Sequence, residues 1–216
     1  MIRMALQSFG NQTVTVLGYE LSIGAGKGVL VFHRSQRLLL RPVWPEDWQG
    51  IKAGIADLLV LRNLASAPHP YSEEDARAFV SRPIPKLHPR FVITLAEDAT
   101  IIGTIGIDPT PDFDAEIGYW IARKYWGHGF ATEAGKAVIK MARSLGFRTL
   151  GAAHFEDNPA SGKVLRNLGF RPTGTRRMQH SLGRGEAASA IEFSLDLEEE
   201  MGVAAADMLE PMPQFA

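Results

Sequence analysis

The amino-acid sequence predicts an α+β domain built on a mixed sheet. From residue 37 onward, strand-like and helical segments follow one another in the order β, α, α, β, β, β, α, β, α, β, β. Three consecutive strands with short connections indicate an antiparallel meander, and the strand–helix–strand unit after them indicates a parallel crossover. The last two strands are close together in the chain and indicate a hairpin.

The composition is typical of one globular domain with some additional residues. The chain has 216 residues, of which 45% are apolar and 22% charged, and this length is enough to bury a full core. The formal net charge of −1 gives no sign of a nucleic-acid or membrane partner. There is no cysteine, which excludes disulfides, thiol nucleophiles, iron–sulfur clusters and most structural zinc sites.

We divide the chain into three segments. Residues 1–36 show no sustained period and are expected to be a flexible extension, residues 37–197 form the domain, and residues 198–216 are a tail with five acidic side chains and no Lys or Arg. No apolar run reaches the roughly 20 residues that a membrane span needs, and the first residues lack the pattern of an export signal. We therefore expect a cytoplasmic protein.

One glycine-rich segment near the start is similar to a nucleotide-binding P-loop. Gly24–Gly28 reads GAGKG, but the motif needs Gly at position 21, where this chain has Leu, and Ser or Thr after the lysine, where it has Gly. The segment is therefore interpreted as part of the extension.

The first elements of the domain are a strand and two helical segments. Arg37–Arg41 is a short strand that a proline ends. Residues 44–64 read as helix, with Pro45 acceptable near its start. A second helix starts at Ser72, whose spacing to Asp75 fits a capping box.

Three strand-like runs follow these helices. Residues 90–96 and 100–107 are separated by the polar turn at 97–99, which predicts a hairpin. A proline-containing loop at 109–112 precedes the third strand, 115–122. A helix then runs from Thr132 to about Leu145, because apolar residues recur there at steps of three and four.

The last part of the domain contains a strand, a helix and two more strands. The strand is expected at 149–155. Asn158-Pro159 is a strong helix start, with an Asn cap and Pro at the first helical position, and Gly169-Phe170 is typical of a helix end. Strands are expected near 170–175 and 189–197, with residues 176–186 between them as a hairpin-like loop.

The most informative segment is Tyr125–Thr132, which reads YWGHGFAT. Its two glycines lie between a strand and a helix, where they allow a tight turn and a close approach of backbone N–H groups to a ligand. The helix that follows points its positive N-terminal end at the same place. The segment therefore predicts an anion site, most often a phosphate site.

Four segments together resemble the GNAT acyl-CoA N-acetyltransferases, in particular the branch of the ribosomal-protein N-terminal acetyltransferases. They read LLLRP at 38–42, IGTIG at 102–106, EIGYW at 116–120 followed by WGHGFATEA at 126–134, and NPAS at 158–161 followed by LGF at 168–170. Each segment alone is weak, whereas four at the family's spacing are specific. The resemblance covers 37–197, about three quarters of the chain.

The resemblance implies a mixed, mostly antiparallel twisted sheet of about six or seven strands with about four helices. The strands near 115–122 and 149–155 would splay apart in a V. It also implies acetyl-CoA as the donor and a primary amine as the acceptor. No cluster of His, Asp and Glu has the spacing of metal ligands, so no metal is expected.

In this family pantetheine lies in the gap between the splayed strands and pairs with backbone near Ile121, and a loop holds the pyrophosphate. The family loop usually begins with Gln or Arg, where this chain has Trp126, so the cradle is expected to consist of backbone N–H groups. The expected cofactor contacts are Ile121, Trp126, Gly127, His128, Gly129, Phe130, Ala131, Thr132 and Asn158.

Acetyl transfer to an amine requires a base, because only the uncharged amine attacks. At pH 7 the neutral form of a lysine-type amine costs about 4.6 kcal/mol, and that of an α-amine only about 1 kcal/mol. Glu116 is the candidate base, acting directly or through a water; the alternative is a carboxylate in a salt bridge at the sheet rim. His154 is a reserve candidate, although a structural histidine explains that position better.

The resemblance places the Ser161 hydroxyl near the cofactor sulfur, where it could protonate the leaving thiolate; a capping or solvent-facing serine is the alternative. Trp44, Trp48 and Tyr71 are candidates for the acceptor pocket, and core packing explains Trp48 equally well.

Several functional questions stay open at this point. The acceptor could be a protein N-terminus or a small-molecule amine, and the protein could form a homodimer. The alternative to an enzyme is a module that binds acyl-CoA as a sensor or scaffold without turnover.

Overall fold

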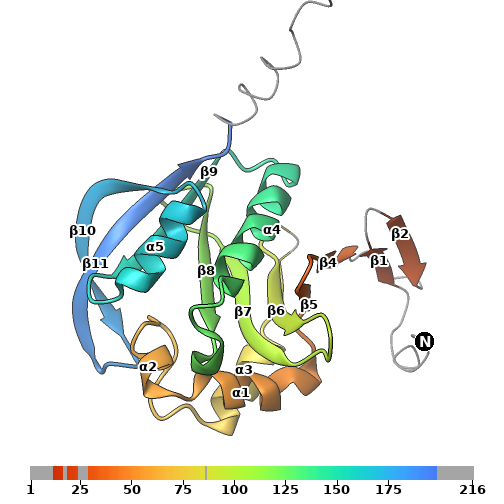
Figure 1. The fold of residues 1–216 in the computed structure, drawn as a ribbon, viewed down its shortest axis with the longest axis horizontal. Helices are drawn as coiled ribbons and strands as arrows, with labels where there is room; N and C mark the ends of the chain where they lie inside the picture. The colour runs from red at the N-terminus through yellow and green to blue at the C-terminus, as the bar shows by residue number, and fades with distance from the viewer. Residues whose placement is uncertain (1–11, 17–18, 24–28, 86, 199–216) are drawn as a thin grey trace, which may run out of the picture.

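The computed structural model describes residues 12–16, 19–23, 29–85 and 87–198 (Figure 1). From residue 37 onward, the order of strands and helices is the expected one, except that the first expected helix is divided. The elements are β4 (His33–Arg34), β5 (Leu38–Pro42), α1 (Trp48–Ile55), α2 (Leu58–Leu61), α3 (Glu73–Ser81), β6 (Arg90–Leu95), β7 (Ile101–Asp108), β8 (Ala115–Ile121), α4 (Phe130–Ser144), β9 (Thr149–Phe155), α5 (Pro159–Asn167), β10 (Arg171–Ser181) and β11 (Glu186–Asp196).

The main sheet has eight strands in the order β10-β11-β9-β8-β7-β6-β5-β4. Strands β4 to β8 form an antiparallel meander, β8 and β9 are parallel, and β9, β11 and β10 are antiparallel again. The expected α+β fold with a mixed, mostly antiparallel sheet is confirmed. The strand that exceeds the expected number is β4, which lies before the residue at which the domain was expected to begin.

The helical region 44–64 is broken into three pieces. A 3₁₀ turn at Pro45–Asp47 leads into α1, and α2 follows after a break at Asp57. Asp57 has extended backbone, and its side chain accepts a hydrogen bond from the N–H of Leu59, so it starts a new helix as an N-cap. This capping aspartate is the local reason why the long helix expected here is divided.

Helix α3 begins as its sequence predicts. The Ser72 side chain accepts from the N–H of Asp75, and the Asp75 carboxylate accepts from the N–H of Ser72, so the capping box is present. Hydrogen bonds from the Ser72 hydroxyl and the Ser72 N–H to its carboxylate hold the pKa of Asp75 below its usual value.

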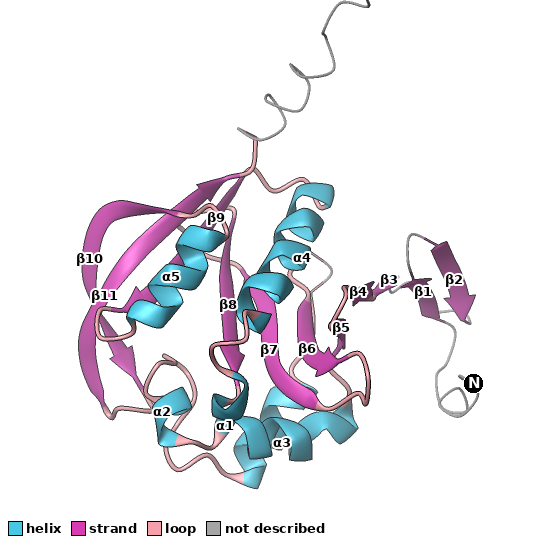
Figure 2. Cartoon of the chain, in the orientation of Figure 1, coloured by secondary structure: helices cyan, strands magenta, loops and turns pink. Residues whose placement is uncertain are grey.

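Two apolar clusters lie on opposite faces of the sheet. One joins α4 and α5 to the sheet through residues such as Val138, Leu165 and Ile117, and the other joins α1 to α3 to the sheet through Ile51, Trp120 and their neighbours. Figure 2 shows α4 and α5 lying over the strands in the middle of the sheet. Since side chains alternate along a strand, β8 contributes to both clusters.

The strands β10 and β11 are longer than expected. Residues 176–181, predicted as loop, continue β10, and the turn covers only 182–185. The tip of this hairpin docks on the segment after α2: the Leu182 N–H donates to the Ala65 carbonyl, and the Ser181 hydroxyl donates to the Leu64 carbonyl. The prediction of a loop was wrong because these tertiary contacts order polar residues that carry no strand pattern of their own.

Part of the N-terminal extension forms strands that the sequence did not predict. β1 (Gln12–Val16), β2 (Tyr19–Ile23) and β3 (Val29–Val31) make a separate three-stranded sheet in the order β2-β1-β3. The glycine-rich segment 24–28 and the acidic tail from residue 199 lie outside the described residues. In the part of the chain that is described, no helix is long and apolar enough to cross a membrane.

Candidate active site

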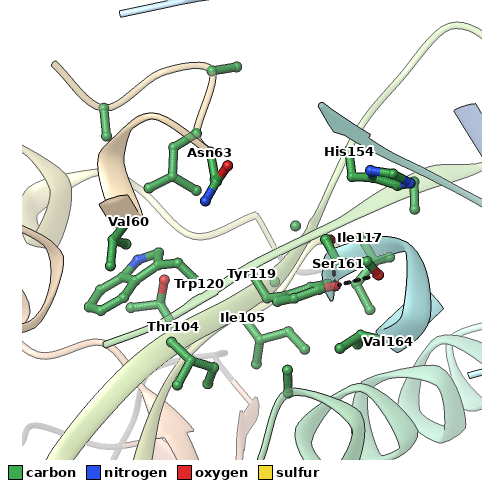
Figure 3. A pocket seen from close by; sticks show the side chains of 18 of the residues that line it. Val60, Asn63, Thr104, Ile105, Ile117, Tyr119, Trp120, His154, Ser161 and Val164 are labelled. Carbon is green, nitrogen blue, oxygen red and sulfur yellow. Dashed lines mark hydrogen bonds between the residues drawn. The ribbon is translucent and has the colours of Figure 1, made fainter. Parts of the chain in front are cut away.

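A cavity of about 860 Å³ reaches residues on both faces of the sheet. Its walls include the loop before α4, the first turn of α5, strand β8 and the segment that follows α2. Figure 3 shows Tyr119 and Ser161 on one side of β8 and Trp120, Val60 and Asn63 on the other. The cavity is therefore a candidate site where two ligands meet across the sheet.

The passage across the sheet exists because β8 and β9 separate. They pair only at Ala115 with Leu150 and at Glu116 with Gly151. The expected V between these strands is confirmed. Beyond the second pair, the edge of β8 faces the gap.

The free edge of β8 offers backbone groups to a ligand. The Ala122 N–H donates to the Ile102 carbonyl at 2.8 Å, and backbone bonding alternates along an antiparallel strand. The N–H and C=O groups of Tyr119 and Ile121 therefore point away from β7, toward the gap. An extended amide chain such as pantetheine could pair with such groups.

Trp126 occupies one of these backbone groups, the Ile121 carbonyl oxygen. Its indole Nε1 donates to the Ile121 carbonyl at 2.6 Å, so that oxygen already has a partner. This leaves the Ile121 N–H and the backbone of Tyr119 as the groups facing the gap. The indole bond also ties the start of the glycine-rich loop to the end of β8.

The loop between β8 and α4 presents a row of backbone N–H groups. Gly127 and Gly129 both have φ of +78°, a conformation that glycine adopts without strain, and α4 starts directly after Gly129. Within the described residues, no protein group accepts a hydrogen bond from the N–H groups of residues 127–132. Open N–H groups at a helix N-terminus fit the diphosphate of a coenzyme A ligand.

Arg37 fixes this loop from the neighbouring part of the sheet. Its guanidinium forms an ion pair with the Glu133 carboxylate at 2.6 Å, donates to the His128 carbonyl at 3.0 Å and lies 4.6 Å from the centre of the Phe130 ring. Hydrogen bonds from Ser35 and Arg37 hold the pKa of Glu133 below its usual value despite partial burial, which raises it. Sequence reasoning missed Arg37, because its partners are about 90 residues away.

Glu116 lies on the face of β8 that is turned toward α1 to α3. It pairs across the strands with Asp108, and its carboxylate is 3.9 Å from the guanidinium of Arg177. Burial raises the pKa of Glu116; the nearby Arg177 opposes this, and neighbouring carboxylates including Asp108 add to it. The net shift is upward, so the carboxylate is a stronger base than an ordinary glutamate.

Ser161 and Tyr119 form a hydroxyl pair on the other face of β8. Their oxygens are 2.8 Å apart, and burial raises the pKa of Tyr119 to about 12. The Asn158 side chain accepts from the Ser161 N–H, as expected for an N-cap. Tyr119 was not predicted, since an aromatic residue in a strand usually belongs to the core.

His154 is held by its own neighbour. Nδ1 lies 2.8 Å from the Phe155 carbonyl, an oxygen that can only accept, so Nδ1 carries the proton. Nε2 is buried, has no partner among the described residues, and faces Gly162, where an added Cβ would be 2.6 Å away. This packing fits a structural histidine, although the residue lines the cavity.

The cavity brings together most residues that the sequence singles out. Tyr71 lines it, whereas Trp44 and Trp48 stack against Arg41 and Arg77 instead. No cluster of three potential metal ligands occurs in the described part of the chain. The candidate residues that line the cavity are Glu116, Ile121, Trp126, Gly127, Gly129, Phe130, Ala131, Thr132, Asn158 and Ser161; His128 does not.

Comparison with known proteins agrees with this architecture. The family model described as acetyltransferase (GNAT) domain matches residues 37–171. The protein named uncharacterized N-acetyltransferase YoaA, from Bacillus subtilis (strain 168), is 32% identical over 139 residues, which cover 61% of this chain and 77% of YoaA.

Two solved structures illustrate the similarity of the fold. Ribosomal-protein-S5-alanine acetyltransferase from Vibrio fischeri has a TM-score of 0.67 at 20% identity, covering 78% of this chain and 98% of that one. RimL, the ribosomal L7/L12 α-N-protein acetyltransferase, in complex with coenzyme A, has a TM-score of 0.65 at 19% identity, covering 75% and 95%.

Proposed function

Because the chain belongs to the GNAT acetyltransferase family, we propose that it transfers the acetyl group of acetyl-CoA to a primary amine by direct attack. The observation that carries the proposal is the cavity that joins the open N–H groups of residues 127–132 to Glu116 through the gap beside β8. An anion site and a base thus share one space.

The donor fits the residues of one face. The N–H groups at 127–132 would hold the diphosphate, and the free edge of β8 would hold the pantetheine arm. Asn158 and Ser161 line the same space at the start of α5. RimL, which shares the fold, is described in complex with coenzyme A.

The acceptor would approach from the face of Glu116. Its neutral nitrogen attacks the thioester carbonyl carbon, a C–N bond forms, and the C–S bond breaks as coenzyme A leaves as a thiolate. Glu116 receives the proton that the amine loses, directly or through a water. Its raised pKa suits this role, because a base is most effective when its pKa approaches the working pH.

The Ser161–Tyr119 pair would lie next to the leaving thiolate and hydrogen-bond to its sulfur. A serine hydroxyl donates one hydrogen bond and accepts others, so Ser161 can donate to the sulfur while it accepts from Tyr119. With a pKa of about 12, the Tyr119 phenol stays protonated at neutral pH. The pair therefore stabilises the thiolate and passes it a proton that solvent replaces.

The test is a thiol titration with acetyl-CoA and a panel of amines: N-terminal peptides, lysine peptides, polyamines and aminoglycosides. Free coenzyme A should accumulate only when a suitable amine is present, and mass spectrometry should find that amine heavier by one acetyl group. Tight binding of acetyl-CoA without thiol release across the whole panel would favour the sensor or scaffold instead.

A further inference from the structure

On the face of the sheet that carries Glu116, the surface between Arg90 and Glu116 is partly bare of side chains. We call this surface the floor. Arg90 on β6 pairs with Gly106 on β7, and Gly106 pairs with Gly118 on β8. Glu116 lies two residues from Gly118 and therefore on the same face. A Cβ added at Gly118 would meet nothing within 4 Å, so the surface between Arg90 and Glu116 carries no side chain at that position.

Two arginines line the cavity at one end of this floor. The guanidinium carbon of Arg90 lies 5.0 Å from the centre of the Phe79 ring, and that of Arg82 lies 6.0 Å from the same centre. Two cations are thus held beside one aromatic ring. Burial lowers the pKa of Arg90 below its usual value; attraction by Asp108 opposes this, and repulsion by Arg82 adds to it.

Neither arginine has a carboxylate partner. Among the described residues, no Asp or Glu lies within 4.0 Å of the Arg82 or Arg90 guanidinium. Asp75, which also lines the cavity, already accepts the N–H and the hydroxyl of Ser72. Asp108 attracts Arg90 only from beyond ion-pair distance. Arg90 is partly buried and Arg82 is exposed; a partly desolvated cation beside a second cation is unfavourable unless a ligand supplies an anion.

We propose that the acceptor carries a carboxylate or phosphate in addition to its amine, and that Arg82 and Arg90 bind this anion while the amine lies at Glu116. This inference rests on the proposed acetyl transfer. Guanidinium groups suit both anions because their N–H groups match pairs of oxygens.

The dimensions of the floor define the ligand further. Strands about 4.8 Å apart and residues about 3.3 Å apart place the Cα atoms of Arg90 and Glu116 about 12 Å from each other. Since both side chains lie over the same floor, the nitrogen and the anion of the ligand are separated by a short chain that lies over Gly118. Asp108, opposite Glu116, adds attraction for the incoming ammonium group.

The experiment compares matched acceptors on the full-length protein. Straight-chain amino acids, amines and diamines of equal length are assayed by thiol release, with aminoalkyl phosphates and acidic N-terminal peptides as further arms. We expect kcat/KM for the anionic acceptors to exceed that of the neutral amines by about 10- to 100-fold, the usual range for a charge-assisted hydrogen bond. The best arm identifies the source of the anion.

Variants assign the preference to the arginines. Arg90→Gln and Arg82→Gln should each remove most of the preference while leaving the KM for acetyl-CoA unchanged, and Arg90→Lys should restore part of it. Arg77→Gln is the matched control, because Arg77 is on α3 but is exposed and does not line the cavity. Gly118→Val should block the longer acceptors, with the fold retained because its side chain enters open space.

Two outcomes would overturn the inference: an equal or better rate with neutral amines or diamines, or an equal loss for anionic and neutral acceptors in the arginine variants. If neutral amines still release thiol, the proposed acetyl transfer stands and only the anion site fails. If no amine of any arm releases thiol, the proposed function fails together with the inference.

Discussion

The groups around Glu116 change its pKa in a direction that suits a base. Burial raises its pKa, Arg177 opposes this, and Asp108, Glu192 and Asp112 add to the increase. A carboxylate with a raised pKa binds a proton more strongly, and it can accept one whenever the pH lies above that pKa. The position thus provides a base that is stronger than an ordinary glutamate and still able to accept a proton.

The rate should follow the ionisation of Glu116. With acceptor saturating, we expect kcat to fall as the pH decreases through a pKa above the ordinary value of 4.5. In Glu116→Gln, kcat at pH 7 should decrease by about 100-fold. The deficit should shrink as the pH approaches the pKa of the acceptor amine, because the neutral amine then needs no base. A pH–rate profile of both proteins measures this.

Glu192→Gln is a control for the same experiment. Glu192 raises the pKa of Glu116 through its charge, so its removal should move the acidic limb to lower pH while the activity at the plateau is retained. An unchanged rate in Glu116→Gln at pH 7 would remove Glu116 from the mechanism.

The positive φ of Gly129 leads to a second prediction for a single residue. Gly129→Val forces an L-residue into a left-handed conformation, at a cost of about 1–2 kcal/mol, and disturbs the N–H groups beside it. We expect the KM for acetyl-CoA to increase about tenfold, with a smaller change in kcat. Steady-state kinetics at saturating amine measures this.

Gly146→Val is the matched control for Gly129→Val. Gly146 has φ of +86° and open space around it, but it follows the other end of α4. Both variants should lose similar stability, whereas only Gly129→Val should change the KM for acetyl-CoA. Equal KM values would contradict the phosphate cradle.

Sequence alone identifies residues whose role is local and misses those whose partners are distant. Asn158 as a cap and the Ser72–Asp75 box follow from spacing within one turn. Tyr119 acquires its role from Ser161, 42 residues later. Arg82 and Arg90 belong to no motif and meet only because Phe79 lies beside both.

At the level of elements, the tip of the β10–β11 hairpin packs against the segment after α2, on the side where we propose that the acceptor binds. Its tip approaches the end of α2 so closely that a Cβ on Gly183 would lie 2.2 Å from the Leu61 carbonyl. Arg184, whose side chain is 8% exposed, donates to the Arg62 carbonyl at 2.6 Å and pairs with Asp157 at the same distance. Because Asp157 precedes Asn158, one arginine joins the hairpin, α2 and the start of α5.

Removal of this connection should loosen the acceptor side. We expect Arg184→Ala to lower the free energy of unfolding by about 1–2 kcal/mol, because it deletes charge-assisted bonds that Asp157, 46% exposed, partly shares with water. The KM for the amine should rise more than the KM for acetyl-CoA. Urea unfolding and steady-state kinetics measure the two effects.

Arg77→Ala supplies the comparison for Arg184→Ala. Its ion pair with Glu73 is exposed on both sides and spans one helical turn, and its guanidinium stacks on Trp48, so the loss should stay below about 1 kcal/mol. If Arg184→Ala were as stable as Arg77→Ala, the bonds of Arg184 would not be what holds the hairpin tip in place.

Elements with a strong internal pattern were predicted well. The strand Thr149–Phe155 has the predicted bounds, and α4 starts two residues before the predicted start. The errors occur where an isolated residue or a tertiary contact decides: Asp57 divides the first helical region, and docking of the hairpin tip orders residues 176–181.

For the whole molecule, the order of elements was sufficient to predict the fold class, and the number of strands was not. β4 contains only two residues, His33 and Arg34, too few for an alternating pattern. The V between β8 and β9 followed from the family resemblance, since no residue pattern specifies where two parallel strands stop pairing.

The cavity that spans both faces of the sheet determines how the acetyl group could move between two bound ligands. In the proposed reaction the donor binds on one face and the acceptor on the other, so both can be bound at once and the acetyl group can move directly from one to the other. Direct transfer needs no covalent acyl-enzyme intermediate. The chain contains no cysteine, the side chain best suited to form one.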